Sequence, residues 1–430
     1  MPDPMPTAAP DALPLGDDLR AFVDASPSPS HAVAELARRL RAAGFTELAE
    51  ADSWAPAPGG QHFVVRHGSL IAFRVGSGAP AESGLRIVGA HTDSPTFKVR
   101  PNNDVRQAGY RLVGVEPYGG GLWHTWLDRE LTVAGRLALR GGTTALVRLP
   151  GAPLRLPSLA IHLDRSVREG LTLDAQQHLV PVWDRDLGSE PGLVEALAAA
   201  AGVSAGDVVG HDLVLADTQP AARAGADGTW IAAPRLDNQF SCHSGVLALL
   251  AAPAGDRTQV LVCNDHEEVG SGSMSGARGS FLEDVVQRLA ADPADPQAVH
   301  RALARSVLVS ADMAHAVHPT RSERHEPSHR PQLGGGPVLK VNANQAYATD
   351  ATTGGWFRER CDAAGVPLQT FVTRADLPCG STIGPLTATR LGVPTVDVGA
   401  PQLAMHSCRE LASADDVPLM VGALTACLAD

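Results

Sequence analysis

TQVLVCNDHEE, residues 258–268, is an apolar run that ends abruptly in polar and acidic residues. A short apolar run rich in β-branched residues and bounded by polar ones predicts a buried strand. The segment SGVLALLAA (244–252) before it and the segment EDVVQRLAA (283–291) after it have the composition and spacing of helices. Strands that alternate with helices predict an α/β fold, with a mostly parallel sheet covered by helices on both faces.

The same alternation continues in both directions along the chain. Towards the C-terminus we predict strands within residues 304–313, 336–342, 368–373 and 394–400, and helices within 357–365, 382–392 and 415–428. Towards the N-terminus we predict strands within 63–75 and 84–93, and a surface helix over Ser30 to Phe45. Residues 1–99 therefore join residues 233–430 in one α/β domain.

Residues 100–232 have a different pattern. Short β-like runs occur at 111–117, 131–139, 143–149, 159–163 and 211–217, separated by glycine and proline, and only residues 192–201 have a long helical pattern. We therefore predict a β-rich domain over residues 100–232, inserted into the α/β domain.

Composition excludes several classes of protein. The 430 residues include 35 Lys and Arg against 47 Asp and Glu, and a net charge of −12 disfavours binding to nucleic acid or to anionic membranes. The start, MPDPMPTAAPDALPLGDD, lacks the features of a signal peptide, and no apolar run reaches the ~18 residues of a membrane span. The six cysteines form no closely spaced pair, which suits reduced thiols. We expect a cytoplasmic protein with neither nucleic-acid nor membrane partners.

Several predicted strands end in residues that bind metals. Reactive groups of open α/β sheets lie beyond the carboxyl ends of the strands, and there the sequence places His91, Asp93, Asp237, Glu267, Glu268, Asp312 and His406. Imidazoles and carboxylates without cysteine suit Zn²⁺, Co²⁺ or Mn²⁺ in hydrolysis. A bridging carboxylate with two further ligands for each metal would make a two-metal centre.

Two spacings indicate roles. Asp93 lies two residues after His91 in an extended chain, so it can accept a hydrogen bond from the ring nitrogen that faces away from a metal. The side chains of Glu267 and Glu268 diverge, so one can bind metal while the other acts as a general base. Either motif alone is common on protein surfaces, and His266, His315, His318, His325 and His329 are alternative ligands. The coincidence of such residues at several strand ends favours a metal centre.

Nearly the whole chain resembles the aspartyl aminopeptidases, the M18 metallopeptidases, which belong with the co-catalytic two-zinc aminopeptidases. The resemblance is carried by VGAHTDSPTFKVRP (88–101), LWHTWLDREL (122–131), LAIHLDR (159–165), RLDNQFSC (235–242), NDHEEVGSGSMSGARGS (264–280), SADMAHAVHP (310–319), HRPQLGGGPVLKVN (329–342), DLPCGSTIGP (376–385) and DVGAPQLAMHSCRE (397–410).

The resemblance implies a ligand set. His91 and Asp312 would hold one Zn²⁺, Glu268 and His406 a second, and Asp237 would bridge them, with Co²⁺ or Mn²⁺ as substitutes. It also implies that the substrates are peptides with an N-terminal Asp or Glu.

Three further implications concern catalysis and assembly. Glu267 would be the general base and Asp93 would orient His91. The insert would be a dimerisation domain, and dimers would assemble into a tetrahedral dodecamer. His162, in the predicted strand LAIHL, would reach the active site of the partner subunit and bind substrate there.

Charge counting points to one more residue. Two Zn²⁺ ions would face the carboxylates Asp93, Asp237, Glu267, Glu268 and Asp312, which leaves no surplus positive charge to attract an acidic substrate. A further cation is required, and Lys340 in GPVLKVN is our candidate; the alternative is a solvated lysine at a strand edge. A broad or neutral, leucine-type aminopeptidase remains the alternative function, and a cage or binding protein stabilised by its metals is a third.

Overall fold

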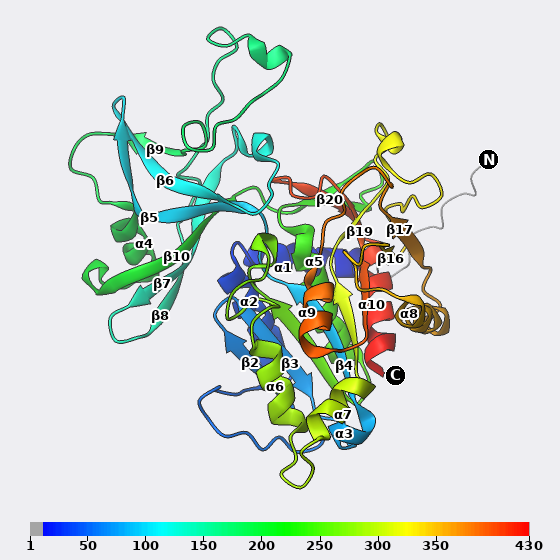
Figure 1. The fold of residues 1–430 in the computed structure, drawn as a ribbon. Helices are drawn as coiled ribbons and strands as arrows, with labels where there is room; N and C mark the ends of the chain where they lie inside the picture. The colour runs from blue at the N-terminus through cyan, green and yellow to red at the C-terminus, as the bar shows by residue number, and fades with distance from the viewer. Residues whose placement is uncertain (1–11, 430) are drawn as a thin grey trace.

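The computed structural model describes residues 12–429 and contains an α/β body and a separate β-rich lobe (Figure 1). The body is built on a nine-stranded sheet. Across the sheet its strands are β1 (Thr46–Glu47), β2 (Gln61–Arg66), β3 (Ser69–Arg74), β13 (Thr258–Asn264), β4 (Leu85–His91), β14 (Val307–Ala311), β18 (Thr395–Gly399), β16 (Val338–Val341) and β17 (Gln369–Val372).

The centre of this sheet is parallel. Strands β13, β4, β14 and β18 all run in the same direction, whereas β2, β3 and β13 are successively antiparallel and β16 is antiparallel to β18. Because parallel neighbours end at the same edge, the carboxyl ends of β13, β4 and β14 lie side by side.

Helices cover both faces of the sheet, as predicted. In β4, Val88 and Ala90 face one apolar core while Ile87 faces the other, as the two-residue period of a strand requires. The first core is closed by α1 (Ala12–Ala25), α2 (Pro29–Ala42), α5 (Leu236–Ala251), α8 (Ala351–Ala364) and α10 (Asp416–Ala429). The second face is covered by α6 (Phe281–Ala290), α7 (Ala298–Arg305) and α9 (Ile383–Leu391), with the short α3 (Pro80–Ser83) against α7.

Two smaller sheets complete the fold. The β-rich lobe, on the left of Figure 1, holds a six-stranded sheet with the order β8 (Thr144–Arg148), β7 (Leu131–Leu139), β10 (Val208–Asp217), β5 (Thr96–Gln107), β6 (Tyr110–Tyr118) and β9 (Val182–Arg185), and α4 (Leu193–Ala201) packs on β8. A five-stranded sheet has the order β11 (Ala222–Ala224), β12 (Trp230–Ala233), β20 (Glu410–Ser413), β19 (Pro401–Leu403) and β15 (Ala314–His315).

Strand pairing indicates where the chain crosses between body and insert. Along the chain, the first strand of the insert sheet, β5, begins at Thr96, and the last strand of that sheet, β10, ends at Asp217. Strand β12 pairs with β20, so Trp230 lies opposite Ser413 in the body. We therefore propose crossings near residues 96 and 217 in place of the divisions after 99 and 232.

One predicted strand is wrong. Residues 159–163 form an exposed turn, and the side chains of Leu159 and Leu163 are 65% and 75% exposed. Their alternating apolar pattern favours a half-buried strand, but within one chain no neighbouring strand pairs with this segment among residues 12–429.

Two features at the N-terminal side lie outside the predictions. Helix α1 was not anticipated, although its Leu19, Phe22 and Val23 are buried. Residues 1–11, which include most of the segment compared with a signal peptide, are outside the described residues. Between residues 12 and 429, the helices are too short or too polar to cross a membrane.

Candidate metal centre

The predicted ligands converge at the carboxyl edge of the sheet. His91 is the last residue of β4, Asp312 follows β14 directly, and Glu267 and Glu268 begin a single 3₁₀ turn (Glu267–Val269) shortly after β13. Asp237 joins them from the first turn of α5, and His406 from the loop between β19 and β20. Residues far apart in the chain thus meet because three parallel strands end side by side.

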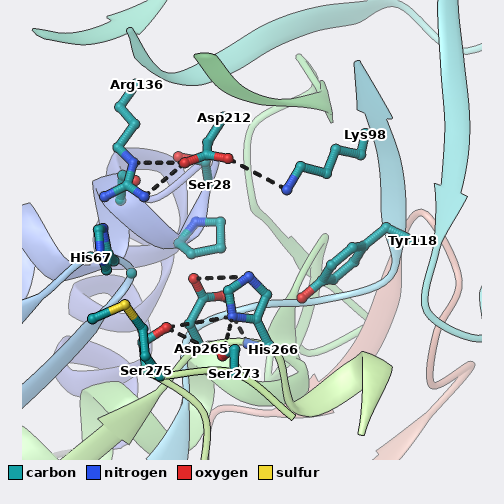
Figure 2. A pocket seen from close by; sticks show the side chains of 14 residues that line it. Ser28, His67, Lys98, Tyr118, Arg136, Asp212, Asp265, His266, Ser273 and Ser275 are labelled. Atoms are coloured by element: carbon teal, nitrogen blue, oxygen red, sulfur yellow. Dashed lines mark hydrogen bonds and ion pairs between the residues drawn. The ribbon is translucent and has the colours of Figure 1, made fainter. Parts of the chain in front are cut away.

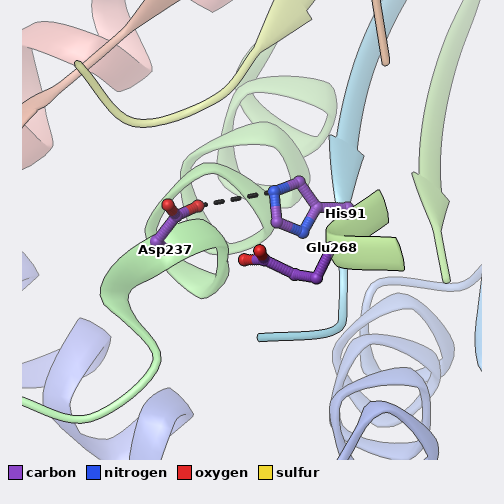
Figure 3. A group of neighbouring side chains, drawn as sticks. All are labelled: His91, Asp237 and Glu268. Atoms are coloured by element: carbon purple, nitrogen blue, oxygen red, sulfur yellow. Dashed lines mark ion pairs between the residues drawn. The ribbon is translucent and has the colours of Figure 1, made fainter. Parts of the chain in front are cut away.

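Asp237 lies between two imidazoles. Its Oδ1 is 3.4 Å from Nε2 of His91, and its Oδ2 is 3.4 Å from Nε2 of His406. Ligand atoms of His91, Asp237 and Glu268 all lie within 4.8 Å of one another (Figure 3). One oxygen of the carboxylate therefore faces each histidine, as a bridging ligand requires.

The remaining two carboxylates lie on either side of this arrangement. Oδ1 of Asp312 is 3.5 Å from Nε2 of His91, and Oε2 of Glu268 is 3.5 Å from Nε2 of His406. The five side chains therefore form two groups of ligand atoms that share Asp237.

The chemistry of this cluster fits divalent metal ions. Asp237 Oδ1 and Glu268 Oε1 are buried and make no hydrogen bond. Buried carboxylate oxygens that make no hydrogen bond are costly, and a cation held between them removes that cost. Nitrogen and oxygen ligands without thiolate match Zn²⁺ in hydrolytic centres rather than in structural ones.

The pKa values show how strongly the cluster requires positive charge. Burial lowers the pKa of His91, but the carboxylates of Asp237, Asp312 and Asp93 outweigh it and raise that pKa well above its usual value. Burial also lowers the pKa of His406, but Asp237 and Glu268 raise it by more, and the resulting pKa is about 10. Burial and then neighbouring carboxylates raise the pKa of Glu268 well above normal. Without metal the site would hold protons where cations are needed.

Glu267 differs from its neighbour in position. Its Oε2 is 4.0 Å from Nε2 of His91, farther than the ligand carboxylates, and its side chain is more exposed than that of Glu268. Burial first, with Asp312 and other carboxylates adding to it and His91 opposing it, raises the pKa of Glu267 to about 8. A carboxylate in this position, beside the ligand groups but farther from His91 than they are, suits proton transfer better than metal binding.

Asp93 holds more of the site than the sequence indicated. Nδ1 of His91 is 3.1 Å from the main-chain oxygen of Asp93 and 3.4 Å from its carboxylate. The carboxylate also accepts the main-chain N–H groups of Glu267 and Glu268, at 3.0 and 3.1 Å. It therefore fixes the turn that carries both glutamates, besides facing the histidine.

Glu410 is a site residue that the sequence reasoning missed. Its buried carboxylate accepts the main-chain N–H of His406 at 2.6 Å and that of Asp237 at 2.9 Å. It is the last residue of the motif DVGAPQLAMHSCRE, but no spacing rule connects it with the ligands.

Lys340 lies beside the metal centre and is not a strand-edge residue. Strand β16 is flanked by β18 and β17, and the lysine is 3% exposed. Its Nζ is 3.7 Å from Oδ2 of Asp312 and 5.4 Å from the ring centroid of Tyr347. The alternative of a solvated lysine is therefore wrong.

His162 lies away from these residues within one chain. It belongs to the exposed turn at 159–163, just before the short 3₁₀ helix Ser166–Arg168, in the loop that projects from the top of the insert in Figure 1. Within residues 12–429 of a single chain, it makes no hydrogen bond or ion pair with a metal-centre residue.

The alternative histidines bond elsewhere. Nδ1 of His266 contacts Ser273 Oγ, Nε2 of His325 accepts the N–H of His318, and His329 pairs with Glu326. His315 lines a cavity of about 300 Å³ that adjoins Lys340 through Tyr347. The other polar and apolar lining residues include Arg324, Arg374, His318, His325 and Phe371.

Comparison with known proteins identifies the family and the fold. Residues 22–427 match the family described as aminopeptidase I zinc metalloprotease (M18). The chain belongs to the M18 family. It is therefore a zinc aminopeptidase, and the predicted family, enzyme class and α/β fold are confirmed.

Relatives of similar length support this membership. The chain is 48% identical over 421 residues to a probable M18 family aminopeptidase 2 of Pseudomonas aeruginosa, covering 96% of this chain and 97% of the relative. It is 50% identical over 418 residues to the probable M18 family aminopeptidase 2 of Mycobacterium leprae, covering 95% of this chain and 97% of the relative.

Solved structures have the same architecture. The M18 chain superposes on Ape4, solved by cryo-EM in complex with Nbr1, with a TM-score of 0.94 and 36% identity over 97% of this chain and 86% of that one. For the crystal structure of prApe1 the TM-score is 0.91, with 30% identity over 96% and 93%. For the S. cerevisiae mApe1 dodecamer it is 0.84, with 29% identity over 96% and 95%.

Proposed function

We propose that this M18 aminopeptidase removes N-terminal Asp or Glu from peptides. The observation that carries the proposal is the cavity of about 300 Å³ lined by His315, Arg324 and Arg374, whose lining residue Tyr347 contacts Lys340. Arginine and histidine side chains line it, and among residues 12–429 no aspartate or glutamate does. A small cavity with this lining favours an acidic side chain over a neutral one.

The metal centre would hold two Zn²⁺ ions. His91 and Asp312 would bind one ion, Glu268 and His406 the other, and Asp237 would bridge them, with Co²⁺ or Mn²⁺ able to replace zinc. When bound, such ions polarise a scissile carbonyl and lower the pKa of water to about 7.

Glu267 would serve as the general base. Its carboxylate lies at the edge of the ligand groups, 4.0 Å from Nε2 of His91, where it would take a proton from water and return it to the leaving amine. Asp93 would keep His91 and the glutamate turn in place.

Lys340 would contribute to acidic specificity through charge. Its ammonium group lies between Asp312 and Tyr347, so part of its charge is offset by the ligand carboxylate. Lys340 itself does not line the cavity of about 300 Å³ but lies behind Tyr347, whereas Arg324 lines that cavity, and so does Arg374, which is paired with Asp376 at 2.8 Å. The three cations together would favour an acidic substrate.

The insert would be a dimerisation domain whose His162 completes the partner's active site. The exposed leucines around His162 support this, because an apolar loop that is solvated in one chain is typical of an interface. The relative mApe1 is described as a dodecamer, and we propose the same assembly here, with dimers arranged tetrahedrally.

A neutral, leucine-type specificity is the second candidate, because Tyr347 and Phe371 provide an apolar wall in the same cavity. A substrate panel separates the two. Initial rates should be measured on Asp-, Glu-, Leu- and Lys-arylamides in a buffer of defined zinc concentration. We expect the highest kcat/KM for the Asp or Glu substrate; a higher value for Leu would establish the second candidate.

The Lys340→Ala variant tests the origin of the preference in the same assay. It should lower kcat/KM for Asp substrates more than for Leu substrates. Equal losses on both would show that Lys340 does not set specificity. Loss of all turnover on chelation, with the assembly intact, would exclude a role limited to a metal-stabilised cage.

A further inference from the structure

The end of β6 brings the insert onto the metal centre of its own subunit. Tyr118, the last residue of β6, donates its hydroxyl hydrogen to Oδ2 of Asp93 at 2.7 Å. The same oxygen accepts the main-chain N–H of Glu268. Figure 2 shows Tyr118 projecting from the insert towards the turn at Asp265 and His266. A side chain of the insert thus completes the hydrogen bonding of the carboxylate that fixes the glutamate turn.

The residues that follow Tyr118 contact the opposite side of the centre. The main-chain oxygen of Gly120 is 3.0 Å from Nδ1 of His406, and the N–H of Leu122 donates to the main-chain oxygen of His406 at 2.9 Å. Thr125 Oγ1 accepts the N–H of Cys408 at 2.8 Å. When Nδ1 of His406 carries the hydrogen and donates it to the main-chain oxygen of Gly120, Nε2 keeps its lone pair on the side of Asp237 and Glu268.

Glycine at position 119 permits this close approach. Its φ is +76°, and a Cβ atom there would lie 3.1 Å from the Cβ of Glu268. At Gly120 a Cβ atom would lie 3.8 Å from Nδ1 of His406. The backbone of the loop therefore lies directly against two of the side chains assigned to the second metal.

We propose that residues 118–125, the capping loop, position the metal ligands within one subunit, with Tyr118 acting through Asp93 and Gly120 through His406. The inference rests on the ligand set proposed above. It gives the insert a role beyond assembly, because the affinity of the centre for zinc then depends on how the capping loop is seated. Groups that orient metal ligands typically change metal affinity by about 10- to 100-fold when removed.

The first test compares two tyrosines of the same strand. Tyr118→Phe removes only the hydroxyl that contacts Asp93, and Tyr110→Phe, at the other end of β6 where the side chain is 50% exposed, is the control. Zinc affinity is measured on the full-length protein by competition with a chromogenic chelator. We expect Tyr118→Phe to weaken zinc binding by about 10- to 100-fold and Tyr110→Phe to leave it unchanged.

The second test compares two glycines with the same backbone requirement. Gly119 and Gly109 have φ values of +76° and +82°, so alanine pays a similar conformational cost at either position. Nothing lies within 4 Å of a Cβ atom at Gly109, whereas Glu268 lies against one at Gly119. Only Gly119→Ala should weaken zinc binding and shift the visible absorption bands of the Co²⁺-loaded protein.

The outcomes separate this inference from the function on which it rests. If the wild-type protein binds no zinc, or if His406→Ala binds it as tightly as wild type, the proposed metal centre is wrong. If the wild type binds zinc and both Tyr118→Phe and Gly119→Ala match their controls in affinity and Co²⁺ spectrum, the capping-loop proposal is overturned. The melting temperature of each metal-free variant shows whether it folds. If the variants of one pair do not fold, the other pair is enough to decide the test.

Discussion

Two buried carboxylates beside the proposed metal ligands accept main-chain N–H groups. Asp93 accepts the N–H groups of Glu267 and Glu268, and Glu410 accepts those of His406 and Asp237. Each carboxylate thereby fixes two residues to which we assign catalytic or ligand roles. Preorganisation of this kind spares the site from reordering its own loops when metal or substrate binds.

Glu410→Ala should destabilise the protein and weaken metal binding. The substitution leaves the buried N–H of Asp237 and the partly buried N–H of His406 without an acceptor, and a buried group in that state costs about 1–3 kcal/mol. Urea unfolding of the metal-free protein should show a loss of at least ~2 kcal/mol. Glu359→Ala, at a glutamate whose side chain is 72% exposed, is the control and should stay within about 0.5 kcal/mol of wild type. Wild-type stability for Glu410→Ala would remove Glu410 from the support of the site.

Glu267→Gln should retain metal and lose turnover. The amide keeps the size of the side chain but cannot take a proton, so kcat should fall by at least ~10². Metal content is measured alongside initial rates, and Glu268→Gln should lose metal as well as activity because Glu268 is in the ligand group of His406. Near wild-type turnover for Glu267→Gln would exclude it as the base.

At this scale the sequence predicted residues whose chemistry is visible in their type and position. The histidines and acids that end β4, β13 and β14 could be identified because apolar runs stop at them. Glu410 and Tyr118 could not, since their partners are main-chain N–H groups and a carboxylate brought close only by the tertiary fold. The roles of the five ligand residues stay predictions until metal is measured.

At the scale of elements, the end of β18 lies so close to the residue that follows its parallel neighbour β14 that Gly399 has no room for a side chain. A Cβ atom there would lie 1.7 Å from the main-chain oxygen of Asp312. The main-chain N–H of Asp312 donates to the main-chain oxygen of Val398, the residue before the glycine. The strand end that carries a ligand is thus packed directly on the glycine.

Gly399→Ala should therefore force the two strand ends apart. We expect a loss of about 1–3 kcal/mol in stability, the usual cost of overpacking, together with weaker metal binding as Asp312 moves. Gly355→Ala, in helix α8 with nothing within 4 Å of a Cβ atom, is the control and should be neutral or slightly stabilising. Equal melting temperatures for the two variants would contradict the packing argument.

Elements were predicted well where burial within one chain explains the pattern. Residues 84–93 contain β4, and the helix expected over residues 30–45 is α2, Pro29–Ala42. The apolar pattern at 159–163 failed because its leucines are not covered within the chain. An alternating pattern reports that a segment becomes buried, but it cannot report whether another element or another molecule covers it.

At the scale of the whole molecule, the proposed sharing of the active site can be tested by mixing two inactive proteins. His162→Ala and Glu267→Gln each remove one component, and a mixed dimer contains one site with both residues intact if His162 acts in the partner's site. Activity should therefore return after subunit exchange, monitored by the same arylamide assay.

Exchange itself is verified by mass spectrometry of differently labelled subunits. No recovery after complete exchange would place His162 in its own subunit's site or outside catalysis. His178→Ala is a suitable control in place of His162→Ala, because His178 is also an exposed histidine of the insert and accepts only the N–H of Asp174.

The distribution of the ligands along the chain has a consequence for biosynthesis. His91 and His406 are separated by the insert and by most of the α/β body, and both lie against Asp237. A ribosome adds about 5–20 residues per second, so the second histidine emerges roughly 15–60 s after the first. Throughout that interval the nascent chain lacks one of the proposed metal ligands. With the ligand set proposed above, peptidase activity would begin only after residue 406 has been synthesised.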